Sequence, residues 1–191
     1  MAKTTYVQIN AFLNWAKVFE QNRDTAERAK KNGVTHKGVI KFLEKYDGQY
    51  LVDVVPATED DLAKAQAVLT DVLYGGNPRY KDSDLGAGKS FQLSRRHDDK
   101  HTFKDRETGQ PKEFDFGGQP EIVWWNDDKG KGTPWDIETD GLIGNGTLAV
   151  VKFSVYMSEA TPSASDTVRL EKIGIIDHVA FESDNNGGER F

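Results

Sequence analysis

The chain has 191 residues, a formal net charge of −6 and no cysteine. Folding a chain of this length buries roughly 70% of the surface that it exposes when unfolded, so we expect one domain with its own core. The lack of cysteine excludes disulfide bonds, thiol catalysis and cysteine-ligated zinc. Because the molecule is acidic overall, binding to a polyanion would have to rest on a local basic patch.

The sequence shows no sign of a membrane or export segment. No apolar run reaches the ~20 residues that span a bilayer, and residues 1–5 lack the apolar core of a signal peptide. We therefore expect a cytoplasmic protein with no membrane partner.

Residues 6–13 alternate between apolar and polar side chains, which predicts a strand with one buried face. Past Asn14 the apolar positions change parity, which predicts a bulge that bends the strand, as closing a small barrel requires. Trp15, Lys17 and Phe19 would then share one side. In residues 6–13 the apolar face carries Val7, Ile9, Ala11 and Leu13, and the other face carries Tyr6, Gln8, Asn10 and Phe12.

Residues 20–47 are interpreted as an insertion into the barrel. Within it, residues 24–31 favour a short helix that Asn32 and Gly33 would end. For residues 34–46 the pattern does not decide between a strand and a helix.

Residues 49–55 are rich in β-branched side chains and predict a strand, which Pro56 ends. A helix from Glu59 to Tyr74 is predicted to follow, with Thr58 and Asp61 forming its N-terminal cap. We expect it to close one end of the barrel through an apolar stripe of Leu62, Leu69, Val72 and Leu73.

The segment 77–106 combines cations with aromatic side chains, and residues 91–96 within it favour a strand. Residues 108–120 contain three glycines and two prolines and predict a mobile hairpin loop. In the next predicted strand, 121–125, the pleat sends Trp124 and Trp125 to opposite faces. Parity alone does not tell which of the two faces the core.

Residues 144–157 form the most regular predicted strand. Its apolar face, from Ala149 to Met157, belongs in the core, whereas Lys152 and Tyr156 lie on the other face. The last predicted strand, 168–179, changes parity near Lys172–Ile173, which again indicates a bulge.

The sequence contains no recognisable catalytic or metal-binding set of residues. Gly86–Ser90 is similar to the end of a phosphate-binding loop, but Ser83 occupies the place of a required glycine and a strand follows instead of a helix. His97 and His101 lie four residues apart on a strand or loop, where cations compete for the nearby carboxylates. We therefore predict that the protein is not an enzyme and uses no cofactor or metal.

Aromatic and basic side chains together indicate a surface for a single-stranded nucleic acid. Most aromatic residues of such a domain belong in the core, and we assign Phe153 there, whereas Tyr6 and Tyr156 lie on polar faces. Single-strand binding requires cations that follow the phosphates and rings that stack on bases, at ~1–3 kcal/mol each. The predicted ssDNA-binding residues are Tyr6, Trp15, Lys17, Arg95, Arg96, Phe103, Lys104, Trp124, Trp125, Lys152 and Tyr156.

Three segments also resemble the single-stranded DNA-binding protein of T-seven-type and related tailed bacteriophages. They are GQYLVDVVP (48–56), IGNGTLAVVKFSVY (143–156) and VRLEKIGII (168–176), and their order and spacing agree from about residue 48 to 181. The resemblance implies a five-stranded OB-fold barrel that coats single-stranded DNA during phage replication and recombination in the infected cell. It also implies that the predicted helix caps the barrel, and it favours a homodimer.

In that family an acidic C-terminal tail that ends on an aromatic residue recruits replication proteins and competes with DNA. Glu189 and Phe191 are therefore the implied contacts with a partner protein. This tail departs from the pattern because it is short and carries only Glu182, Asp184 and Glu189 against Arg190.

The predicted organisation is a single OB-fold domain over residues 1–181, with the insertion near 20–47, and a flexible tail over 182–191. Two other functions stay open at this point. One is a β-rich carbohydrate-binding or phage structural module, in which exposed tryptophans would stack on sugars. The other is an RNA-binding OB-fold, because OB-folds bind both nucleic acids.

Overall fold

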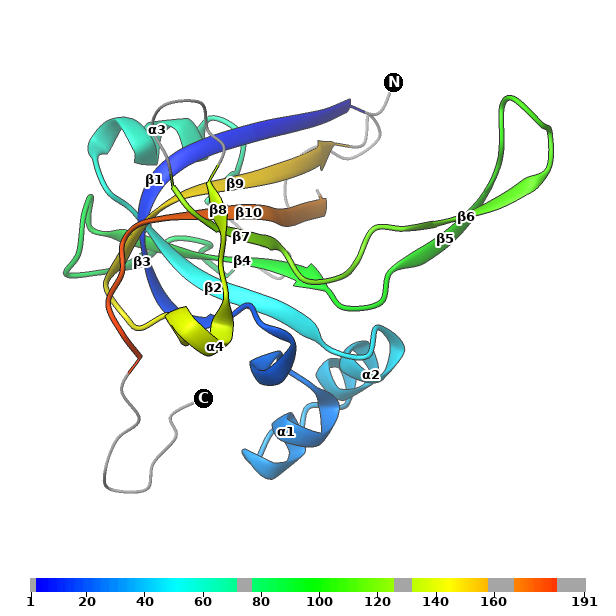
Figure 1. Cartoon of the computed structure of the whole chain (residues 1–191), viewed down its shortest axis with the longest axis horizontal. Coiled ribbons are helices and arrows are strands. Elements are labelled where there is room, and N and C mark those ends of the chain that lie inside the picture. The colour runs from blue at the N-terminus through cyan, green and yellow to red at the C-terminus, as the bar shows by residue number, and fades with distance from the viewer. Residues whose placement is uncertain (1–2, 72–76, 126–131, 158–166, 182–191) are drawn as a thin grey trace. The chain divides into compact units, whose positions relative to one another are not determined.

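The computed structural model describes residues 3–71, 77–125, 132–157 and 167–181, and most of its elements are strands (Figure 1). The mainly β class that the sequence predicted is confirmed. The chain divides into two compact units. The first comprises Met1–Ala16, Val52–Leu93 and Glu121–Phe191, and the second comprises Lys17–Leu51 and Ser94–Pro120.

Within the described residues, eight strands form one sheet. The long strands β1, β9 and β10 lie side by side in the first unit (Figure 1). Two short helices, α3 (Glu59–Gln66) and α4 (Ile137–Asp140), also belong to this unit. The strand order is β3 (Lys81–Asp82), β4 (Lys89–Arg96), β2 (Gln49–Pro56), β1 (Lys3–Lys17), β9 (Thr147–Met157), β10 (Thr167–Asp177), β7 (Glu121–Trp124) and β8 (Thr133–Pro134).

The antiparallel ladder between β1 and β9 runs through the middle of this sheet, from the pair Lys3–Met157 to the pair Leu13–Thr147. Burial confirms the alternation predicted for β1, whereas in β9 the predicted core face is buried but Val150 and Ser154 of the opposite face are buried too. At Trp15 the backbone has φ +52°, so the direction of β1 changes where the parity change was predicted. The buried side chains of the ladder are Val7, Ile9, Ala11, Leu13, Ala149, Val151, Phe153 and Val155.

Strand β10 pairs antiparallel with β9 and parallel with β7. The register shifts between Leu170 and Lys172, beside the position where the sequence predicted a bulge. The core face of β10 carries Leu170, Ile173 and Ile175, all buried. The bulge therefore keeps the apolar residues on the core side of a strand whose sequence parity changes.

An aromatic chain fills part of this core. The ring of Tyr80 lies 5.3 Å from that of Phe91, which lies 6.0 Å from that of Phe153, measured between centroids. Phe153 is fully buried, which confirms its assignment to the core. Burial raises the pKa of Tyr80 to about 12.

The first turn of helix α3 is hydrogen-bonded to β1. Thr58 Oγ1 accepts a hydrogen bond from the amide of Asp61 (3.2 Å) and donates one to Asp61 Oδ2 (2.7 Å). The other carboxylate oxygen of Asp61 accepts from the amide of Asn10 on β1 (3.1 Å). The predicted cap is thus confirmed, and the same carboxylate also joins the helix to the sheet.

Helix α3 ends at Gln66, before the predicted end at Tyr74. The carbonyl of Leu69, which a longer helix would use for its own ladder, accepts a hydrogen bond from the Tyr80 hydroxyl instead (3.1 Å). Of the predicted apolar stripe, Leu62 and Leu69 are buried, and Val72 and Leu73 lie outside the described residues.

The second unit contains the predicted insertion and a separate hairpin. The helix expected in residues 24–31 is α1 (Ala26–Lys31), and the undecided segment 34–46 forms helix α2 (Lys37–Lys45). Residues 108–120 were predicted as a loop, but they include strand β6 (Pro111–Asp115), which pairs with β5 (Lys100–Lys104). Strand pairing and contacts between phenylalanine rings outweigh the glycines and prolines there.

The sequence suggested that Phe19 and Trp15 lie on one side of the strand, but Phe19 is buried and Trp15 is exposed. Only 4% of Phe19 is exposed, against 42% of Trp15. Strand β1 ends at Lys17, and Phe19 starts a short 3-10 helix, η1 (Glu20–Asn22). The chain changes direction after Lys17, so strand alternation no longer decides where Phe19 lies.

Glu20 is the centre of a polar network in the second unit. Its carboxylate accepts hydrogen bonds from the buried Tyr50 hydroxyl (2.6 Å) and from Arg23 (2.6 Å), and it lies 3.1 Å from His97 Nε2. The Tyr50 hydrogen bond, together with the charges of His97 and Arg23, holds the pKa of Glu20 below its ordinary value. The other ring nitrogen of His97, Nδ1, lies 3.3 Å from Asp47 but is buried without a hydrogen-bond partner among the described residues.

We predict that Asp61→Ala lowers the free energy of unfolding by about 1–3 kcal/mol, because it leaves the Asn10 amide without its acceptor and removes part of the helix cap. Asp61→Asn keeps an acceptor oxygen and should lose less. Chemical denaturation followed by circular dichroism measures both variants. Equal losses would contradict the role of the contact with Asn10.

We also predict a pH-dependent contribution from Glu20. Because its pKa in the folded protein lies below the ordinary value of 4.5, this contribution is present above about pH 4.5 and is lost as the pH falls through the folded pKa. Tyr50→Phe removes the largest cause and should cost about 1 kcal/mol at pH 7. In thermal melts between pH 7 and pH 3, the gap between wild type and variant should narrow at the acidic end, and a constant gap would refute this account.

Candidate nucleic-acid interface

One open face of the sheet in the first unit gathers three of the predicted binding residues. Tyr6 on β1 pairs with Ser154 on β9, and Lys152 and Tyr156 flank Ser154 on the same face because side chains alternate along a strand. Tyr6 is 62% exposed, Tyr156 is 47% exposed, and Lys152 is also exposed. We call the surface formed by Tyr6, Lys152 and Tyr156 the open face.

Within the open face, the ammonium group of Lys152 lies 5.2 Å from the centre of the Tyr6 ring. A cation–π contact at an exposed site is worth only ~0.5–1 kcal/mol. A phosphate group could therefore draw the flexible lysine away from the ring. Both the cation and the ring would then be available to a ligand.

Strand β10, with its bulge, adds charged residues to this face that sequence reasoning missed. Arg169 pairs with Ser154, and Lys172 pairs with Lys152. Glu171 reaches the same side, because its carboxylate accepts a hydrogen bond from the Ser154 hydroxyl (2.7 Å). A bulge places two consecutive residues opposite one partner residue, so the parity change near Lys172 was the signal that could have identified them.

Trp125 lies on the same side of the sheet as Lys152. Its ring covers Gly174, where a Cβ atom would come within 2.7 Å of the indole. Gly174 pairs with Val150, which shares the face of Lys152 by alternation. The register of β10 thus answers the question that the sequence left open.

Trp124 lies on the opposite side of the sheet. It pairs with Ile175, a buried core residue. Its ring lies 4.6 Å from that of Trp135 and 5.9 Å from that of His178, measured between centroids. Trp124 therefore does not join the open face.

Trp15 is exposed, but it lies far along β1 from the open face. It follows Tyr6 by nine residues, which corresponds to roughly 30 Å at ~3.3 Å per residue of strand. Its amide donates a hydrogen bond to Asn145 (2.7 Å). Lys17 is half-buried and belongs to the second unit.

Arg95 and Arg96 have structural partners that the sequence did not predict. The guanidinium of Arg95 donates to the carbonyl of Gly118 (2.8 Å) and to that of Gly117 (3.1 Å). That of Arg96 lies 4.2 Å from the centre of the Tyr46 ring and 3.5 Å from Asp99. Both arginines therefore support the second unit itself.

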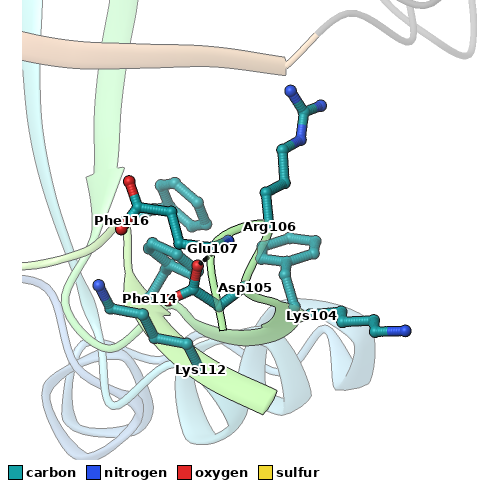
Figure 2. A pocket seen from close by; sticks show the side chains of 8 residues that line it. Lys104, Asp105, Arg106, Glu107, Lys112, Phe114 and Phe116 are labelled. Carbon is teal, nitrogen blue, oxygen red and sulfur yellow. Dashed lines mark hydrogen bonds between the residues drawn. The ribbon is translucent and has the colours of Figure 1, made fainter. Parts of the chain in front are cut away.

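Phe103 and Lys104 are both exposed on β5. They line a hollow of about 800 Å³ on the hairpin formed by β5 and β6 (Figure 2). The structure thus places these two predicted residues in the second unit, apart from the three residues of the open face.

The glycine-rich segment and the histidine pair, which the sequence analysis considered for phosphate and metal binding, form contacts within the fold. In the glycine-rich segment, the amide of Ala87 donates to the Pro56 carbonyl and that of Gly88 to the Leu85 carbonyl, each at 2.8 Å, so these amides are not directed at a phosphate. In the described part of the chain, no group of three or more histidine, aspartate or glutamate residues could hold a metal ion. No described helix is both long and apolar enough to span a bilayer. Glu189 and Phe191 lie outside the described residues.

No protein-family model and no curated protein matches the chain. Among solved structures, the chain is similar to the crystal structure of gp2.5, a single-stranded DNA-binding protein encoded by bacteriophage T7. The two are 20% identical, and the match covers 93% of this chain and 96% of the other, with a TM-score of 0.42. A likeness at this level does not establish a shared family.

Proposed function

We propose that the chain is a non-enzymatic protein that binds single-stranded DNA without regard to sequence. The observation that carries the proposal is the open face, where two exposed tyrosine rings and a lysine come from neighbouring strands. Every base has a π-face, so stacking on Tyr6 and Tyr156 would be sequence-tolerant. Lys152 would pair with a phosphate of the same strand.

The sequence resemblance supports both the ligand and the setting of this proposal. Two of the resembling segments, 143–156 and 168–176, supply β9 and β10, which carry Lys152 and Tyr156 of the open face and the charged residues beside them. We assign the sheet to an OB-fold barrel because β1 bends at Trp15 and lies between β2 and β9. The proposed role is to protect single-stranded DNA during phage replication and recombination, in the cytoplasm of the infected cell.

Local charge limits how strongly phosphates can contribute. The chain carries a net charge of −6, and the ammonium of Lys172 lies 3.5 Å from Glu121. Glu171 adds a carboxylate beside Ser154. Lys152, whose contact in the structure is a ring, is therefore the cation that we expect to contribute most to the salt dependence of binding.

We predict that Lys152→Ala weakens binding to an oligo-dT and lowers the slope of log K against log salt by about 0.7, the value for one phosphate contact on a single strand. Lys152→Arg should keep the slope. Fluorescence anisotropy of a labelled oligonucleotide at several salt concentrations measures the affinity and its salt slope. Lys81→Ala, on the edge strand β3, is a charge-matched control. An unchanged slope for Lys152→Ala would remove this residue from the interface.

We predict that Tyr156→Ala weakens binding by about 1–3 kcal/mol, the value of one stacked base, with no change in the salt slope. Tyr156→Phe keeps the ring and should bind like the wild type. Because Tyr156 is exposed, the melting temperature of both variants should stay nearly unchanged. A large loss of stability instead would mean that the ring contributes to the fold.

Competition experiments separate the other functions. Unlabelled DNA, RNA and oligosaccharides are each added to the complex with labelled oligo-dT. We expect single-stranded DNA to displace the probe best. Stronger competition by matched RNA would assign the interface to RNA, and displacement by a glycan would favour a carbohydrate-binding module.

A further inference from the structure

The hairpin β5–β6 presents a cluster of aromatic rings on one of its faces. His101 and Phe103 on β5 are in register with Phe114 and Lys112 on β6, so these four side chains share a side. Phe116 completes the cluster. The rings of Phe103, Phe114 and Phe116 lie 5.8 to 6.4 Å from one another, measured between centroids.

Part of this cluster has a structural role. A two-stranded hairpin is marginally stable alone, and aromatic pairs across its strands stabilise it. The hairpin does not use all of the ring surface, however, because Phe103 remains 51% exposed and Phe114 37% exposed. These rings line the hollow of about 800 Å³ shown in Figure 2.

Three cations, Lys104, Arg106 and Lys112, line the hollow, and their side chains extend in different directions around it (Figure 2). Lys112 shares the face of the rings, whereas Lys104 alternates with Phe103 along β5 and so starts from the other face. None of the three forms an ion pair with any residue that the structure describes. The neighbouring Asp105 accepts a hydrogen bond from the amide of Glu107 (2.8 Å), which stabilises the turn.

We propose that this hairpin face is a second base-stacking site for single-stranded DNA. Phe103 and Phe114 would stack on bases, and Lys104, Arg106 and Lys112 would contact the phosphates on either side. The inference rests on the proposed function and extends it, because it gives the second unit a binding site of its own. Binding would then be bipartite, with one contact in each unit.

The cations favour DNA over an apolar protein segment as the occupant. A surface that binds an apolar peptide loses energy when it desolvates charges that have no ion-pair partner. Three such cations line this hollow, next to the carboxylates of Asp105 and Glu107, and one of them, Lys112, lies 5.4 Å from the centre of the Phe114 ring. A single strand of DNA suits both kinds of side chain. Its bases stack on the rings, and its anionic phosphates pair with the cations.

Photo-crosslinking of the full chain tests the site directly. An oligo-dT that contains 5-iododeoxyuridine is bound to the protein, irradiated and digested, and the crosslinked peptides are identified by mass spectrometry. We expect crosslinks both within residues 100–116 and on β1 or β9. Crosslinks confined to β1, β9 and β10 would overturn the second site and leave the proposed function standing.

Two sets of variants test the same site by affinity. Phe103→Leu keeps apolar volume but loses the stacking ring, and should weaken binding to a long oligo-dT roughly 5- to 100-fold, as one stacked base implies. Replacing Lys104, Arg106 and Lys112 together by alanine leaves the rings in place and should lower the salt slope by about 2. Thr102→Val, on the other face of β5, is the control for hairpin integrity.

The possible results distinguish failure of the second site from failure of the proposed function. Unchanged affinity and slope in both sets, with normal binding by the wild type, would overturn the inference alone. Self-association that Phe103→Leu abolishes, with DNA affinity unchanged, would identify the face as a contact between copies of the chain. No binding of single-stranded DNA by the wild type would refute the proposed function, and the second site with it.

Discussion

The antiparallel ladder between β1 and β9 determines which side chains of the first unit can meet a ligand. Ile9, Val151 and Phe153 are essentially fully buried on one side of it. A slip of one residue in register would move every such side chain to the open side, so the burial of these residues fixes the register. Tyr6 and Lys152 lie on the solvent side because the residues next to them in each strand lie on the core side. The binding surface is thus a consequence of core packing.

Departures from regular strand geometry determine what else joins that surface. The bulge in β10 brings Lys172 to the face of Lys152, where Arg169 also lies, and the missing side chain of Gly174 allows the Trp125 ring to lie against the sheet. In the second unit the cluster around Phe103 forms on a hairpin in which each strand has five residues. Each unit thus presents rings and cations of its own.

Short-range patterns were enough to predict strands β1, β2, β4, β7, β9 and β10 and the cap of α3, because each depends on residues close in sequence. They were not enough for interactions between distant segments. Arg95 looked available until the carbonyls of residues 117–118 were found as its partners, and Trp124 could not be told from Trp125 without the register of β10. Strand β6 was missed because glycine and proline dominate the local pattern, whereas its pairing with β5 decides the structure.

The most direct measurement of the central claim is the tryptophan fluorescence of the intact chain during titration with oligo-dT. Trp125 lies on the same side as Lys152, so a strand bound across this side should quench its emission. The account predicts saturable quenching at low salt that weakens as salt is added, and a much smaller effect of double-stranded DNA. No quenching by oligo-dT at low salt would contradict it.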